Sequence, residues 1–271
     1  MTNATKRHAH MVDDPLRTRP LLNAIRKVVR PGDIVIDIGT GLGILAIAAA
    51  DAGAERVYAI DCDAEAIAYA KSASKKEGLD DFIEFIEGLS FHSKIDEKAD
   101  LIICETVGSF AFDEGILTTL KDAKERFLKP NGRIIPRTLE LWGAPLLRLP
   151  KISYPSETAS VFKTDLAAKP ELIEEIDLLT NFSKRIRKKT QFECIKQGVI
   201  PAFAMWPKVT WWDDEITDAS PLLPQTHWKQ GILPIEARDI DEGDVVKFEC
   251  LIEPHPEEPL TMTERLWRWA D

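Results

Sequence analysis

Cysteine is scarce in this chain, and no two cysteines lie near one another in the sequence. The four are Cys62, Cys104, Cys194 and Cys250. Because they form no C-x-x-C pair, the pattern argues against a zinc site and against a disulfide framework. Widely spaced cysteines fit a reducing compartment, so we expect a cytoplasmic protein that holds no metal.

The chain also lacks an excess of positive charge and a long apolar run. Its formal net charge is −10, whereas nucleic-acid binding needs a basic surface that neutralises phosphates. We therefore expect no nucleic-acid partner, and we interpret the basic run at 184–189 as a solvated face. No stretch approaches the roughly 18 apolar residues of a membrane helix, and the N-terminus has no apolar signal-peptide region. This predicts a protein that is neither membrane-bound nor secreted.

The most informative stretch is IVIDIGTGLGILAIAAA at 34–50. Apolar, mostly β-branched residues around Asp37 predict a buried strand, and an Ile/Leu/Ala helix follows the glycines. Gly39, Gly41 and Gly43 permit turn dihedrals that other residues resist, and they let a ligand approach the backbone amides. The G-x-G-x-G spacing resembles the nucleoside-binding loop of class I S-adenosylmethionine methyltransferases. The alternative is a structural glycine-rich turn in another α/β domain.

Strands and helices alternate through the first half of the chain. Helical spacing runs from Asp14 to Val29, although Pro15 and Pro20 should confine the regular helix to its second part. Further strands are expected at 57–60, 82–86, 99–104, 133–136 and 138–147, helices at 64–78 and from near 114 to 128, and a turn at 129–132. This alternation predicts a parallel sheet with a ligand site at its carboxyl edge.

Acidic residues follow two of these strands at that edge. Asp61 lies eighteen residues beyond Gly43, where nucleotide-binding folds place a carboxylate on the ribose hydroxyls. It could instead cap the next helix, although Asp63 is the better cap. Glu105 follows the fourth strand directly, and Glu114 comes nine residues later. The alternative for Glu114 is a helix N-terminal acid favoured by the macrodipole.

From about residue 141 the pattern changes to short strand-like runs such as QFECI, KVTWW and VVKFECLIE, separated by prolines. Only residues 170–179 keep a helical signal. We therefore expect an N-terminal segment and helix at 1–30, a Rossmann-like parallel-sheet domain at 31–140, and a mostly antiparallel, β-barrel-like domain at 141–271.

Five separated motifs together resemble the protein arginine methyltransferase family. They are HAHMVDDPLR at 8–17, DIGTGLGIL at 37–45, ETVGSFAFDE at 105–114, LKPNGRIIP at 128–136 and QTHWKQG at 225–231. In order, they resemble the family's cofactor-covering segment, first cofactor motif, double-glutamate loop, the stretch after that loop, and the Thr-His-Trp loop. The chain is thus identified as a shortened, divergent member of that family.

The resemblance implies an S-adenosyl-L-methionine cofactor and a set of residues around it. These are His8, Met11, Arg17, Asp37, Gly39, Gly41, Asp61, Ser90 and Glu105, with Arg17 on the cofactor carboxylate and Asp61 on the ribose. Ser90 stands beside Phe91, which replaces the acidic residue that the family places near the adenine. The cofactor would thus be covered from the N-terminal side.

The resemblance also implies the catalytic residues. Glu105 and Glu114 would grip a guanidinium, which is planar and permanently charged and suits bidentate carboxylates. His227 would accept the proton, oriented by Asp14. The alternative is that His227 is a satisfied loop histidine.

Three functions remain open at this point. The first is methylation of an arginine or other guanidino group of a protein, peptide or small molecule. The second is methylation of another amine or a hydroxyl, and the third is cofactor binding without catalysis. Thr106, Val107 and Ser109 replace the family's Trp-Met and tyrosine, which favours a peptide or a small molecule over arginine-rich tails. A homodimer is the family expectation, and the dimerisation arm at 154–179 should be a small helix or absent.

Overall fold

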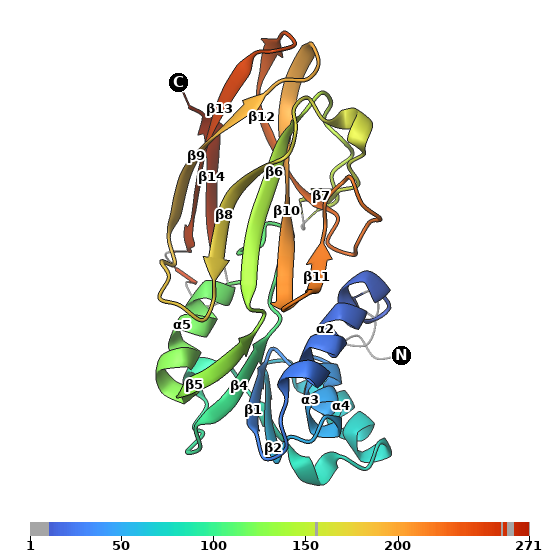
Figure 1. The fold of residues 1–271 in the computed structure, drawn as a ribbon, viewed down its shortest axis with the longest axis vertical. Helices are drawn as coiled ribbons and strands as arrows, with labels where there is room; N and C mark the ends of the chain where they lie inside the picture. Colours follow the sequence, from blue (N-terminus) through green and yellow to red (C-terminus); the bar gives the residue numbers. More distant parts are fainter. Residues whose placement is uncertain (1–10, 155–156, 256, 259–262, 271) are drawn as a thin grey trace.

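The computed structural model describes residues 11–154, 157–255, 257–258 and 263–270, and it divides into two parts along its longest axis (Figure 1). The first part holds α2 (Pro15–Val28), β1 (Ile34–Ile38), α3 (Ile44–Asp51), β2 (Arg56–Asp61), α4 (Ala64–Lys76), β3 (Ile83–Glu87), β4 (Ala99–Cys104), α5 (Ile116–Phe127) and β5 (Leu128–Ile135). Its five strands pair in the order β3-β2-β1-β4-β5, and every pair is parallel. The Rossmann-like prediction is confirmed.

The order of the strands reverses beside β1, which pairs with β2 on one side and β4 on the other. Right-handed crossovers in opposite directions place the connecting helices on opposite faces of a sheet. Accordingly, α3 and α4 lie on one side and α5 on the other (Figure 1). A crevice forms at the carboxyl ends of strands where the order reverses, so the ends of β1 and β4 mark the expected ligand site.

Helix α2 departs from the prediction, because it runs unbroken from Pro15 and includes Arg17. Asp14 caps it by accepting the Leu16 amide at 3.0 Å, and Pro15 occupies the first turn, where its missing N–H costs nothing. Pro20 lies inside the helix and cannot donate to the Leu16 carbonyl. That carbonyl instead accepts the Thr217 hydroxyl at 3.1 Å. A tertiary hydrogen bond thus replaces the helical one.

The second part is antiparallel, and its first strand begins at Thr138. It contains β6 (Thr138–Leu146), β7 (Thr158–Ala159), β8 (Glu171–Asp177), β9 (Ile186–Glu193), β10 (Gly198–Trp212), β11 (Glu215–Asp218), β12 (Gln230–Ile240), β13 (Val245–Pro254) and β14 (Thr263–Trp269). One sheet has the order β7-β12-β10-β6-β8 with β11 beside β10, and the other has the order β14-β13-β9. Phe203 of β10 stacks on Phe248 of β13 with ring centroids 3.7 Å apart, so the two sheets share a core.

The helix predicted at 170–179 is wrong, because these residues form strand β8. Its ladder with β6 shifts register between Leu141 and Trp142, which leaves Ile173 as an extra residue. A bulge of this kind turns the two-residue period of a strand into a three-residue step. Ile173 and Ile176 are therefore both buried, although they stand three positions apart, as on one face of a helix.

The structure also bears on the predicted turn at 129–132, the dimerisation arm at 154–179 and the basic run at 184–189. Lys129–Gly132 are looped out of the ladder, because the pairing jumps from Leu128 to Arg133. The described residues between 154 and 179 form no α-helix, so no helical arm is present there. In the basic run, Arg185, Arg187 and Lys188 each pair with a glutamate of β8 or β13.

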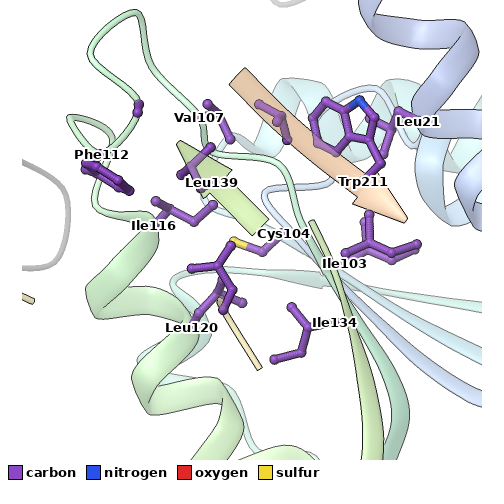
Figure 2. Close-up of a cluster of buried hydrophobic side chains, with 14 of the residues drawn as sticks. Leu21, Ile103, Cys104, Val107, Phe112, Ile116, Leu120, Ile134, Leu139 and Trp211 are labelled. Carbon is purple, nitrogen blue, oxygen red and sulfur yellow. The ribbon is translucent and has the colours of Figure 1, made fainter. Parts of the chain in front are cut away.

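The two parts share a continuous core (Figure 2). Ile103 and Cys104 of β4, Leu139 of β6, Trp211 of β10 and Leu21 of α2 are all fully buried there. Helix α2 also contacts the β10–β11 turn, where Lys27 pairs with Asp214 at 2.7 Å. Within the described ranges, no helix combines the length and apolar character needed to cross a membrane.

Gly43→Ala should destabilise the fold more than Gly78→Ala. Both glycines have a positive φ, +82° and +70°, so both substitutions strain the backbone. Only at Gly43 would the new Cβ lie 2.7 Å from the Ala70 Cβ of α4, whereas at Gly78 no heavy atom lies within 4 Å. We expect Gly43→Ala to lose about 1–3 kcal/mol more free energy of unfolding, measured by denaturant titration. Equal losses would show that the loop does not need this close approach.

Candidate active site

A cavity of about 1,170 Å³ opens at the carboxyl ends of the parallel strands. It lies where the strand order reverses, and a loop of the antiparallel part at 225–229 closes one side. The predicted residues that border it are Met11, Asp14, Arg17, Gly39, Gly41, Asp61, Ser90, Glu105, Glu114 and His227. His8 lies outside the described residues. Residues that are more than 200 positions apart in the sequence, such as Met11 and His227, therefore line one cavity.

Asp61 lies beside the glycine-rich loop and does not cap α4. Its Oδ2 accepts the Gly41 amide at 2.7 Å, and its Oδ1 accepts the Asp63 amide at 2.8 Å. Asp63 is the cap, because its carboxylate accepts the amides of Glu65 and Ala66. The capping alternative for Asp61 is excluded, and its carboxylate borders the cavity as a ribose-binding group would.

Asp37 differs in position from the other described residues of the predicted cofactor site. It is fully buried beneath the loop and does not border the cavity. Its Oδ2 accepts the Thr40 hydroxyl at 2.6 Å. Burial raises the pKa of Asp37 to about 7, with the Asp61 carboxylate adding to the effect. Asp37 therefore supports the glycine-rich loop from below, and its contact with the cofactor stays a prediction.

Arg17 extends from α2 to the double-glutamate loop. One of its terminal nitrogens donates to the Glu105 carboxylate, and the other donates to the Met11 carbonyl at 3.3 Å. Its Nε and the Thr226 hydroxyl are buried without a hydrogen-bond partner among the described residues. Both residues border the cavity, and buried donors of this kind need an acceptor. The amino-acid end of S-adenosylmethionine, with its carboxylate, supplies one, so the residues present fit the cofactor.

Glu105 and Glu114 both border the cavity. Burial raises the pKa of Glu105, while the charge of Arg17 opposes the shift. Desolvation by the surrounding protein raises the pKa of Glu114 to about 7, and the carboxylates of Asp113 and Glu105 add to the shift. Glu114 keeps a solvent-exposed surface at the cavity, so solvent screens part of this effect. A cation that enters the cavity would lower the pKa of Glu105 and Glu114 and so favour their ionised forms.

His227 and Asp14 form the predicted pair, although 213 positions separate them in the chain. Asp14 Oδ2 lies 2.9 Å from His227 Nδ1 and also accepts the His227 amide at 2.8 Å. Burial acts to raise the pKa of Asp14, but the hydrogen bonds from His227 and Leu16 lower it overall. One ionised carboxylate therefore caps α2 and orients the histidine ring.

Trp228 is a site residue whose role the sequence did not reveal. Its indole Nε1 donates to the Val107 carbonyl at 2.7 Å, and its own carbonyl accepts the Ser109 hydroxyl at 2.9 Å. Trp228 thus fastens the double-glutamate loop to the antiparallel part. The motif at 225–231 included this tryptophan, but nothing in the spacing indicated its partners.

Glu114→Gln should flatten the pH dependence of stability. A carboxyl group whose pKa is higher in the folded state than its ordinary 4.5 destabilises the fold as pH rises through about 7. Glutamine stays neutral, so the variant should gain thermal stability relative to the wild type at pH 8 but not at pH 4. The measurement is thermal unfolding at both pH values, with the exposed Glu125→Gln as the control. An identical shift in both variants would contradict the raised pKa of Glu114.

Comparisons with known proteins are consistent with this geometry. The family model described as Ribosomal protein L11 methyltransferase (PrmA) matches residues 17–137, which cover α2 and the parallel sheet. A protein arginine N-methyltransferase 6 from Danio rerio is 28% identical over 92% of this chain and 82% of its own length. The protein arginine N-methyltransferase PRMT10 of Arabidopsis thaliana is 38% identical, over 50% of this chain and 36% of its own length.

Solved structures show a similar fold over nearly the whole length of this chain. A chain of the Trypanosoma brucei PRMT1 enzyme-prozyme heterotetrameric complex with AdoHcy has a TM-score of 0.84, 20% identity and 98% coverage of both chains. Protein arginine methyltransferase 10 of Arabidopsis thaliana has a TM-score of 0.83, 21% identity and 97% coverage of both chains. With the motifs and the cavity, these matches show that the chain is similar in sequence and in fold to protein arginine N-methyltransferases.

Proposed function

We propose that this chain methylates a guanidino nitrogen of a protein, peptide or small-molecule acceptor. The observation that carries the proposal is that two carboxylates, Glu105 and Glu114, border the same cavity as the glycine-rich loop and Asp61. A cofactor site and an anionic acceptor slot are thus adjacent. A protein that only bound the cofactor would have no use for the second carboxylate.

On the cofactor side, the loop from Gly39 to Gly43 would receive the nucleoside and Asp61 its ribose hydroxyls. Ser90 would lie near the adenine, and Arg17 would bind the amino-acid carboxylate. S-adenosylmethionine supplies an electrophilic methyl group on a sulfonium. The chain's own contribution is to orient that group toward the carboxylates and to keep the site shielded from water.

On the acceptor side, Glu105 and Glu114 would hold the guanidinium by charge-assisted hydrogen bonds. They attract its positive charge toward the nitrogens that they contact, so another nitrogen keeps more of its lone pair for in-line attack. A guanidinium also lowers the pKa of both carboxyl groups by bringing an opposite charge. Substrate binding and ionisation of Glu114 therefore support each other.

The His227–Asp14 pair would receive the proton that the methylated nitrogen loses. Asp14 holds the Nδ1 side of the ring at 2.9 Å, which leaves Nε2 as the acceptor. Because the proton is lost late, we expect this pair to contribute less to the rate than the two glutamates.

We also propose a homodimer, which the heterotetrameric assembly named for the Trypanosoma brucei structure supports in general terms. Between 154 and 179, Tyr154 and Phe162 expose 73% and 56% of their surface. Sedimentation at concentrations well above those of the assay should show a dimer. A monomer throughout would remove this proposal.

Asp61→Ala should weaken binding of S-adenosylhomocysteine at least tenfold, because a charged hydrogen bond to the ribose contributes about 1.5–3 kcal/mol. Isothermal titration calorimetry measures this directly. Asp63→Ala is the matched control, because it removes the neighbouring helix cap without altering a residue that borders the cavity. Equal affinities in the two variants would refute the ribose assignment.

Glu105→Gln and Glu114→Gln should each lower turnover of a guanidino acceptor by about a hundredfold or more. Glutamine keeps the shape but removes one of the two anionic charges that act on the guanidinium. The assay follows transfer of labelled methyl groups to a panel of arginine peptides, proteins and free guanidino compounds. Affinity for S-adenosylhomocysteine should hardly change in Glu114→Gln. Undiminished turnover in both variants would favour an amine or hydroxyl acceptor instead.

A further inference from the structure

Glu114 has no direct anchor of its own. Glu105 directly follows β4 and contacts Arg17, whereas Glu114 stands at the far end of the loop, just before α5. None of the described residues makes a hydrogen bond or an ion pair with the Glu114 carboxylate. Its position is therefore set by the backbone on either side of it, which is the loop before it and α5 after it.

The loop is held by Phe110, which is fully buried and contacts two strands of the antiparallel part. The end of its ring points at Gly231 of β12, where a Cβ would lie 2.5–2.7 Å from the ring atoms. Only the missing side chain of Gly231 leaves room for the ring. Arg265 of β14 lies over the ring, with its guanidinium carbon 4.2 Å from the ring centroid. This is a cation–π contact of a half-buried arginine.

The same guanidinium attracts Asp113, the residue directly before Glu114. Arg265 Nη1 lies 3.8 Å from Asp113 Oδ2, and Nη2 lies 2.7 Å from Glu157 Oε2. Asp113 Oδ1 accepts the Phe110 amide at 3.0 Å and so closes the turn. Burial raises the pKa of Asp113, while the charge of Arg265 opposes the shift.

Asp113 and Glu114 are neighbours in the sequence, but only one of the two side chains reaches the cavity. Glu114 borders the cavity, whereas Asp113, Phe110 and Arg265 do not. By attracting Asp113 away from the cavity, Arg265 leaves Glu114 as the carboxylate that reaches it. The contact also partly neutralises Asp113, whose charge would otherwise repel an ionised Glu114 at close range.

We propose that Arg265, in the C-terminal strand β14, is a positioning residue for the acceptor slot: it holds Phe110 and Asp113, and through them it places Glu114. This inference rests on the proposed guanidino methylation for its kinetic consequence, but the contacts themselves do not. The antiparallel part would then shape the acceptor slot through its last strand as well as through Trp228.

The kinetic test compares Arg265→Ala with Arg268→Ala. Arg268 lies on the same strand and pairs with Glu249 away from the loop, so it controls for losing an arginine of β14. Arg265→Ala should raise the KM for a guanidino acceptor and lower kcat/KM at least tenfold, because misplacing a reacting group costs about this much or more. Its affinity for S-adenosylhomocysteine should stay within about twofold of wild type, since the cofactor side is untouched. Arg265→Lys keeps the charge but not the planar fork, and should recover part of the activity.

A second measurement does not depend on turnover. Hydrogen–deuterium exchange of the peptide covering 105–114 should become faster in Arg265→Ala and stay at the wild-type rate in Arg268→Ala. If the wild type methylates no guanidino compound, the proposed function fails, and this exchange still decides the positioning role. Unchanged exchange, or equal kcat/KM in the two arginine variants, would overturn the inference. A matching loss of cofactor affinity in Arg265→Ala would also overturn it, because the residue would then support the whole fold rather than the slot.

Discussion

The site depends on holding two carboxylates in one cavity at the edge of a protein core. Carboxylates resist burial and repel each other. Burial raises the pKa of both Glu105 and Glu114, and the carboxylates of Asp113 and Glu105 add to the shift at Glu114. The surrounding structure offsets this cost unevenly. Arg17 contacts Glu105 directly, whereas its charge lowers the pKa of Glu114 without a direct contact, and Arg265 attracts Asp113, the residue before Glu114. A cationic acceptor would complete the balance, which gives the slot a physical reason to select a guanidinium.

This arrangement explains why the chain needs both of its parts. The parallel sheet opens the crevice and supplies the glycine-rich loop with Asp61, but the residues that fix the acceptor side come from the antiparallel part. His227 is held by Asp14 at the start of α2, and Trp228 fastens the double-glutamate loop by two hydrogen bonds. The shared core around Ile103, Leu139 and Trp211 keeps the two parts in register. Substitutions at this junction should therefore affect the slot before they affect the cofactor.

The sequence predicted those features that depend on local chemistry. The strand, glycine loop and helix at 34–50 could be read because burial on both faces and turn dihedrals each leave a compositional signal. The motif resemblance paired His227 with Asp14 and Glu105 with Glu114. Predictions failed where a distant group changed the local rule: Thr217 satisfies the carbonyl that Pro20 leaves free in α2, and a bulge at Ile173 gives strand β8 a helical spacing. The contacts of Phe110 with Gly231 and Arg265 could not be predicted, because Arg265 belongs to none of the five motifs.

The central claim is that the cofactor and a guanidinium are bound side by side in this cavity. A crystal structure of the protein with S-adenosylhomocysteine and an arginine-containing peptide tests it most directly. The account predicts nucleoside density at Gly39–Gly43 with Asp61 on the ribose, and guanidinium nitrogens within hydrogen-bond distance of both Glu105 and Glu114. A guanidinium bound elsewhere, or one that contacts neither carboxylate while the cofactor site is filled, would contradict it.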